Sequence, residues 1–193
     1  MERIGVILGS TRPARFSERP ARWVAEALAA RGDLDVEQLD LREYPLPFYE
    51  QPAPPARTLR EYPDEAIERW GQKIDAADGF VFVTSEYNHG YPAALKNAID
   101  HLFPEWHRKP AAFVGYGNVG GARAIEQLRE VVVELEMAPL RHAVHILPDV
   151  MVPAMRADDY DASLFESLEP KLQLLADDLA WWTKALAAAR VAA

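Results

Sequence analysis

The chain has 193 residues, 49% of them hydrophobic, which is enough for one domain over residues 1–193 with a sizeable core. Its formal charge of −9 argues against nucleic acid or an anionic membrane as the main partner. The absence of cysteine excludes disulfides, thiolate catalysis and cysteine-ligated metals. Because the sequence shows neither a secretory signal nor an apolar run near the roughly 20 residues of a membrane span, we expect a soluble cytoplasmic protein.

The N-terminal third of the chain begins with a short apolar run that predicts a buried strand over Arg3–Leu8. A polar loop and a helix follow, and the helix ends near Ala30, where Gly32 terminates it. Asp35–Leu41 is a more polar strand, which fits the edge of a sheet. Tyr44–Pro63 holds six of the fifteen prolines, so we expect a packed segment without regular structure.

Strands and helices alternate through the rest of the chain. The pattern predicts a helix over Asp64–Ala77 and then the most apolar strand, Gly79–Val83, at the centre of the sheet. The later elements are a helix over Pro92–Phe103, a strand over Ala111–Gly115, a helix marked by Ile125, Leu128, Val132 and Leu135, a strand over Ala143–Leu147, and a final helix over Ser163–Ala187. This alternation predicts an α/β fold, a flavodoxin-like three-layer sandwich with a five-stranded parallel sheet of order 2-1-3-4-5.

In that order, the loops after strands 1, 3 and 4 meet at the carboxyl edge of the sheet, where open α/β sheets bind ligands. The first loop carries hydroxyls and arginines before a helix, a combination that suits a phosphate. These side chains are Ser10, Thr11, Arg12, Arg15 and Ser17. The sequence has neither a P-loop nor a dinucleotide fingerprint after the first strand, which leaves a mononucleotide as the expected ligand. A capped helix with solvated arginines is the alternative.

The loops after strands 3 and 4 complete the predicted site. Tyr87 offers an aromatic wall, Asn88 offers hydrogen bonds and Gly90 permits a tight reversal of the chain. The segment Gly115–Gly121 contains four glycines, which favours close approach of backbone to a flat ligand, although a flexible turn is the alternative. His89 has no partner in the sequence, so we interpret it as a loop residue. No metal-ligand spacing and no catalytic pair of side chains is visible.

Two stretches of the sequence resemble the NAD(P)H-dependent FMN reductase family, which is related to azo, quinone and chromate reductases. The first is GSTRPAR at Gly9–Arg15, and the longer and more specific one is EYNHGYPAALKNAID at Glu86–Asp100. The resemblance covers Met1 to about Leu147. Two departures stand out: Ser85 replaces the usual proline, and residues 116–120 replace a common Ser-x-Gly-Gly pattern.

The resemblance implies roles for ten residues. Those expected to bind the FMN phosphate are Ser10, Arg12, Arg15 and Ser17. Those expected to line the isoalloxazine are Glu86, Tyr87, Asn88 and Gly90, with Gly117 and Asn118 covering its other side. The two departures bear on the redox tuning of the flavin or on the shape of the substrate pocket.

The family further implies a homodimer or homotetramer with tightly bound FMN and ping-pong chemistry. NADPH or NADH gives a hydride to the flavin, which passes it to a small acceptor such as a flavin, quinone, azo compound or metal oxyanion. No catalytic side chain is needed, because the flavin performs the redox chemistry. Two alternatives stay open here: a non-enzymatic flavodoxin-type electron carrier, or a flavin-free α/β interaction protein.

Overall fold

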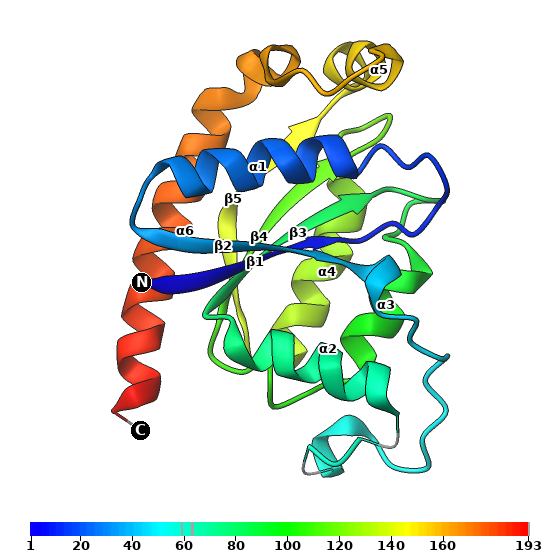
Figure 1. Cartoon of the computed structure of the whole chain (residues 1–193), viewed down its shortest axis with the longest axis vertical. Coiled ribbons are helices and arrows are strands. Elements are labelled where there is room, and N and C mark those ends of the chain that lie inside the picture. The colour runs from blue at the N-terminus through cyan, green and yellow to red at the C-terminus, as the bar shows by residue number, and fades with distance from the viewer. Residues whose placement is uncertain (59, 63, 193) are drawn as a thin grey trace.

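A computed structural model describes residues 1–58, 60–62 and 64–192 and shows a five-stranded sheet between two layers of helices (Figure 1). The parallel strands are β1 (Glu2–Leu8), β2 (Leu34–Asp40), β3 (Gly79–Ser85), β4 (Pro110–Tyr116) and β5 (Ala138–Ile146). Their order is β2-β1-β3-β4-β5. The predicted flavodoxin-like order is therefore confirmed, with β2 at an edge and β3 at the centre.

The helices cover both faces of the sheet (Figure 1). They are α1 (Glu18–Ala30), α2 (Glu65–Ala76), α3 (Ala93–Asp100), α4 (Ala122–Glu134), α5 (Pro148–Arg156) and α6 (Glu169–Val191). Helices α1 and α6 pack on one face, and α2, α3 and α4 pack on the other. Short 3-10 turns are η1 (Leu41–Glu43), η2 (Pro55–Arg57) and η3 (Ala162–Leu168).

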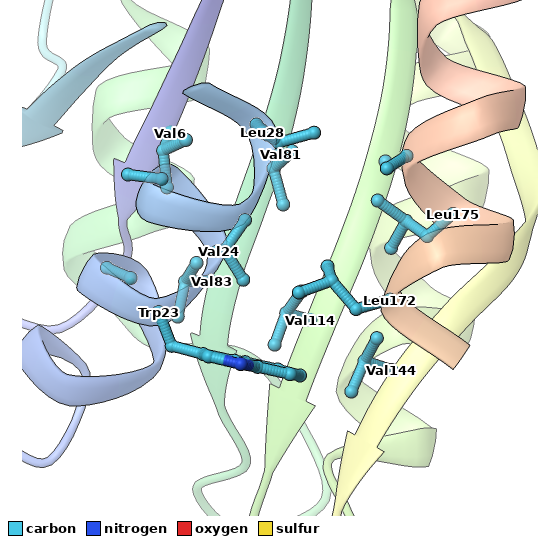
Figure 2. Packing of buried hydrophobic residues seen from close by; sticks show 14 of the residues in the cluster. Val6, Trp23, Val24, Leu28, Val81, Val83, Val114, Val144, Leu172 and Leu175 are labelled. Carbon is cyan, nitrogen blue, oxygen red and sulfur yellow. The ribbon is translucent and has the colours of Figure 1, made fainter. Parts of the chain in front are cut away.

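Each central strand is buried on both faces, which explains its unbroken apolar sequence. Along β3, Val81 and Val83 point toward α1 and α6, whereas Phe80 and Phe82 join the core under α2, α3 and α4. Figure 2 shows Val81 and Val83 beside Val114 of β4, under α1 and α6. The alternation matters for the site, because it decides which side chain reaches which face at the carboxyl edge.

Three boundaries and one helix differ most from the prediction. Helix α3 ends at Asp100, three residues before the predicted end at Phe103. Strand β5 begins five residues earlier than predicted, at Ala138, in a segment that the charged Arg141 disguises. The final α-helix starts at Glu169, because the preceding residues form η3. Helix α5 was not predicted at all.

The proline-rich segment has the irregular backbone that we expected in its described part. Leu46 packs against the core, and the backbone N–H of Tyr49 donates to the side-chain oxygen of Asn97 at 2.9 Å. Phe48, in contrast, is 82% exposed. Residues 59 and 63, which the prediction included, lie outside the described residues. No helix in the described ranges is both long and apolar enough to cross a membrane.

Candidate functional site

The three loops singled out in the sequence meet at the carboxyl edge of the sheet, where they surround a pocket of about 280 Å³. The pocket is lined by Arg12, Ala14, Arg15, Phe16, Ser85, Glu86, Tyr87, Tyr116, Gly117, Met151 and Met155. The first loop, the end of β3 and the end of β4 all contribute. The predicted meeting of these loops is thus what the structure shows.

Arg15 lines the pocket, and its guanidinium also has partners within the protein. Only 1% of its side chain is exposed, and its guanidinium forms a salt bridge with Asp40 at the end of β2. It also donates to the carbonyl oxygen of Ser10 at 2.6 Å. Burial alone would raise the pKa of Asp40, but hydrogen bonds from Arg15 and Arg42 outweigh burial and lower that pKa to about 2. Arg15 therefore braces the first loop from within.

Arg12 and Tyr87 line the pocket, and Ser10 is buried beside Tyr87. The hydroxyls of Ser10 and Tyr87 lie 2.9 Å apart, and the Arg12 guanidinium lies 5.7 Å from the centre of the Tyr87 ring. Burial raises the pKa of Tyr87, yet the hydrogen bond from Ser10 and the nearby Arg12 charge produce a net lowering. The side chains leave a positive charge and several hydroxyls at one point of the pocket.

Two buried hydroxyls at this edge have no hydrogen-bond partner among the described residues: Ser17 Oγ and Ser85 Oγ. Ser17 is the residue before α1, so its hydroxyl lies at a helix N-terminus, where the backbone favours anions. Leaving a buried hydroxyl unpaired costs free energy, and native proteins rarely do so without a ligand or water. Hydroxyls, an arginine and a helix N-terminus fit the phosphate group of FMN.

The loop after β3 is a tight reversal, but not by the predicted means. Tyr87 and Gly90 pair with each other, and the left-handed positions are Asn88, with φ +50°, and His89, with φ +70°. Two consecutive positive φ angles are typical of a type I′ turn, which asparagine tolerates well. Gly90 instead allows close approach of Gln127, whose Oε1 would lie 3.1 Å from an added Cβ. The side chains of Asn88 and His89 are exposed.

Glu86 joins this loop to α4. Its carboxylate, 5% exposed, forms a salt bridge with Arg123 and accepts the backbone N–H of the same residue at 3.1 Å. Burial raises the pKa of Glu86, but the bonds from Arg123 outweigh burial and lower it. The carboxylate is thus held at the start of α4, and the backbone N–H of Glu86 donates to the carbonyl of Tyr116 at 3.1 Å.

The glycine-rich loop is shorter than predicted, because Gly115 and Tyr116 belong to β4. Gly117 lines the pocket with φ +146°, a backbone conformation that is open only to glycine. Asn118 and Val119 are exposed. The close approach of backbone to ligand that we predicted is therefore possible at Gly117.

Six residues that line the pocket are not among the ten predicted site residues: Ala14, Phe16, Ser85, Tyr116, Met151 and Met155. The sequence predicts a loop at Tyr116, which the structure places at the end of β4. Met151 and Met155 come from α5, the helix that was not predicted. The alternation along β4 gave a usable signal only for Tyr116, which follows Ala112 and Val114 on one face.

Within the described ranges, no three His, Cys, Asp or Glu side chains could hold a metal ion together. Asp161 caps η3 by accepting the backbone N–H of Ser163 at 2.9 Å. Lys96 and Asp100 form a half-exposed ion pair at 2.5 Å.

Comparison with known proteins agrees with this geometry. The family model of NADPH-dependent FMN reductases matches residues 2–150. An NAD(P)H-dependent FMN reductase of Schizosaccharomyces pombe is 41% identical over 152 residues, which cover 78% of this chain and 76% of that protein. Another, of Saccharomyces cerevisiae, is 37% identical over 184 residues, covering 90% and 95%.

More distant relatives extend the picture over the whole chain. A quinone reductase of Pseudomonas putida is 29% identical over 189 residues, which cover 94% of each protein. The structure of the flavoenzyme NAD(P)H:(acceptor) oxidoreductase of Paracoccus denitrificans superposes with a TM-score of 0.73 at 25% identity, covering 96% of this chain and 98% of that one. By the family match over most of its length and the identity to the yeast proteins, the chain belongs to the NADPH-dependent FMN reductase family.

Proposed function

We propose that the protein is an FMN-dependent NAD(P)H oxidoreductase whose cofactor lies in the pocket at the carboxyl edge of the sheet. The observation that carries this proposal is the family match over residues 2–150, which include all three loops around the pocket. Membership of an enzyme family favours this function over a non-enzymatic electron carrier and over a flavin-free interaction protein.

Within this site, Ser10, Arg12 and Ser17 are proposed to bind the FMN phosphate. The hydroxyls donate hydrogen bonds, and Arg12 supplies a charge that no described residue neutralises by a salt bridge. Arg15 belongs to the same loop, but its contacts with Asp40 and Ser10 support a positioning role instead. Its contribution to phosphate binding is therefore indirect.

The isoalloxazine is proposed to lie against the two later loops. Glu86, Tyr87, Asn88 and Gly90 form one side, and Gly117 with Asn118 forms the other. When bound, FMN supplies the hydride chemistry between NAD(P)H and the acceptor. The chain holds the cofactor, keeps Glu86 ionised against Arg123 and surrounds the ring with backbone that the salt bridge fixes in place.

The acceptor is proposed to be a planar quinone-type compound. Helix α5 places Met151 and Met155 at the pocket, where Phe16 adds a further apolar wall. Apolar and aromatic walls suit a flat organic acceptor better than a hydrated metal oxyanion. The quinone reductase of P. putida, which aligns along most of this chain, supports the same choice. Free flavin and azo compounds share this planar chemistry and are the competing acceptors.

A homodimer or homotetramer in the cytoplasm is proposed as the working form. Large apolar side chains are exposed at Phe48, 82%, and at Trp181, 65%, more than an isolated subunit needs. Light scattering coupled to size-exclusion chromatography measures the mass directly. A mass of about one chain at micromolar concentration would contradict this part of the proposal.

The function is tested on the purified protein. We expect it to be yellow, to release FMN on denaturation and to be bleached by NADPH or NADH in anaerobic stopped-flow measurements. Reoxidation by a panel of acceptors then ranks quinone, flavin, azo compound and chromate. A carrier would be reduced directly only slowly, and a colourless protein that takes up no added FMN would overturn the proposal.

A further inference from the structure

Ser85, the first departure from the family pattern, and Tyr116, the first residue of the second departure, are neighbours in the structure. They are register partners at the ends of β3 and β4. On β3, Ser85 continues the face of Val81 and Val83, and on β4 Tyr116 continues the face of Val114. Figure 2 shows these valines under α1, so the same face leads from the apolar core to the N-terminus of α1.

Both residues place a hydroxyl at the carboxyl end of an otherwise apolar face of the sheet. Ser85 is 2% exposed and Tyr116 is 6% exposed, yet both line the pocket. Burial raises the pKa of Tyr116, while the nearby hydroxyls of Ser85, Ser17 and Ser10 offset part of this rise. Tyr116 therefore keeps its proton and can donate it in a hydrogen bond.

Ser85 Oγ has no hydrogen-bond partner within the described part of the chain, and neither has Ser17 Oγ nearby. With Tyr116, and with Ser10 and Tyr87, whose hydroxyls are 2.9 Å apart, these residues gather five hydroxyls near Arg12. Five neutral donors around one cation suit a small, highly charged group with several oxygen acceptors better than a polyol, which needs donors and acceptors in equal measure.

We propose that Ser85 and Tyr116 are further binding residues for the phosphate group of FMN, acting beside Ser10, Arg12 and Ser17. This inference rests on the proposed function, and it deepens that function by predicting discrimination between FMN and unphosphorylated riboflavin. A proline at position 85 would offer neither a hydroxyl nor a backbone N–H. The serine and the tyrosine thus act as a pair, because they occupy adjacent places on neighbouring strands.

The test compares Ser85→Ala and Tyr116→Phe with a matched control, Thr183→Val. Thr183 is also fully buried, and its hydroxyl likewise lacks a partner among the described residues, but it lies beside Gly79 at the opposite end of β3. The full-length apoprotein of each variant is titrated with FMN and with riboflavin by quenching of flavin fluorescence. Inorganic phosphate is titrated separately by calorimetry.

We expect Ser85→Ala and Tyr116→Phe each to raise the Kd for FMN about tenfold, as loss of a hydrogen bond to a charged group does. Riboflavin binding stays within about twofold of the wild type, and Thr183→Val changes neither Kd. Ser85→Ala leaves the stability of the apoprotein unchanged or higher, because its hydroxyl loses no protein partner. This stability measurement separates ligand binding from a structural role.

Unchanged FMN affinity in both variants would overturn the inference, and so would an equal loss for riboflavin, which would place the hydroxyls elsewhere on the flavin. If the wild type binds phosphate but no FMN, the proposed function fails, and the hydroxyl pair is judged by the loss of phosphate binding in the two variants. If the wild type binds neither, both proposals fall.

Discussion

At the amino edge of the sheet, Lys109 and Arg190 are paired within the protein, whereas at the carboxyl edge the hydroxyl of Ser85, which has no partner among the described residues, lines a pocket. Lys109 Nζ donates to the carbonyl oxygens of Ile74 and Asp75 at 2.7 and 2.9 Å. Arg190 donates to Asp78 at 2.5 Å. At the other edge, Ser17 and Ser85 have no partner in the part of the chain that the structure describes, and a pocket lies beside them.

This difference separates polar groups that hold the fold from polar groups that are kept for a ligand. The cations of the amino edge join the end of α2 and the end of α6 to the sheet through their hydrogen bonds. The unpaired hydroxyls of the carboxyl edge gain hydrogen bonds only when a ligand or water binds beside them. Arg15 with Asp40 is the exception at the carboxyl edge, since it is a closed internal pair.

Removing the Asp40 side chain from its pair with Arg15 has the largest expected effect on stability. Asp40→Ala leaves the buried Arg15 guanidinium without its main partner, so we expect the free energy of unfolding to fall by about 3–5 kcal/mol in urea denaturation. The matched control is Asp35→Ala, because Asp35 pairs with Arg3 and both side chains are about half exposed. That variant should change stability by less than about 1 kcal/mol. Equal losses in the two variants would contradict a bracing role for Arg15.

The same pair predicts a pH dependence in acid. The folded-state pKa of Asp40, about 2, lies below the ordinary value of 3.8. The ionised carboxylate therefore contributes stability that is fully present above about pH 4 and is lost as the pH falls through about 2. Asp40→Ala should remove this part of the acid sensitivity, which unfolding curves at several acidic pH values measure by comparison with the wild type.

Lys109 gives a further pH-dependent prediction at the amino edge, where stability again rises with pH but in the alkaline range. Burial lowers its pKa from 10.5 to about 8, so the unfolded chain binds more protons between these values and stability rises with pH there. We expect the wild type to gain about 2–3 kcal/mol over Lys109→Met between about pH 7.5 and pH 10. Lys73→Met, at an exposed lysine paired with Glu37, is the control and should show no such gain. Parallel pH profiles for wild type and Lys109→Met would contradict the burial argument.

The sequence predicts those features that depend on residues close together in the chain. The strand order, the edge place of β2 and the meeting of three loops follow from apolar runs and from alternation, and they are confirmed. The left-handed turn is different: its positive φ angles fall on Asn88 and His89, although Gly90 seemed the obvious residue for them. The backbone pairing of Tyr87 with Gly90 makes Asn88 and His89 the central residues of the turn, and residue types alone do not predict that pairing.

Side-chain partners far apart in the chain could not be predicted. Arg15 suits a phosphate by residue type, but its true neighbour Asp40 comes from the next strand, and no spacing rule connects them. Helix α5 was missed because Pro148 and Pro153 obscure its helical pattern, although a proline at a first helical position is favourable. The ligand roles of Ser10, Arg12, Ser17 and the later loops remain predictions until binding is measured.

Gly117→Ala tests whether the backbone at the carboxyl edge contacts FMN. An alanine is strained at φ +146°, so we expect a loss of about 1–2 kcal/mol in stability together with weaker FMN binding, because the pocket wall must shift. Gly32→Ala is the control: its φ is +75° and no atom lies within 4 Å of an added Cβ. It should cost about 1 kcal/mol and leave FMN affinity unchanged. Equal FMN affinity in both variants would argue against backbone contact at Gly117.

The smallest expected effect concerns the acceptor and is measured at Met155. This side chain lies on α5, beyond the stretch that the family model matches, and is 55% exposed at the rim of the pocket. Met155→Glu places a charge where a planar quinone would lose apolar contact, so kcat/KM for benzoquinone should fall about fivefold, or about 1 kcal/mol. Leu174→Glu, 53% exposed on α6, is the matched control for an added surface charge. Reduction by NAD(P)H is measured separately in both variants, which distinguishes an effect on the acceptor alone from an effect shared with the nicotinamide. An equal kcat/KM for benzoquinone in the two variants would argue against contact between the acceptor and α5. Selectivity for the acceptor would then come from the three loops alone.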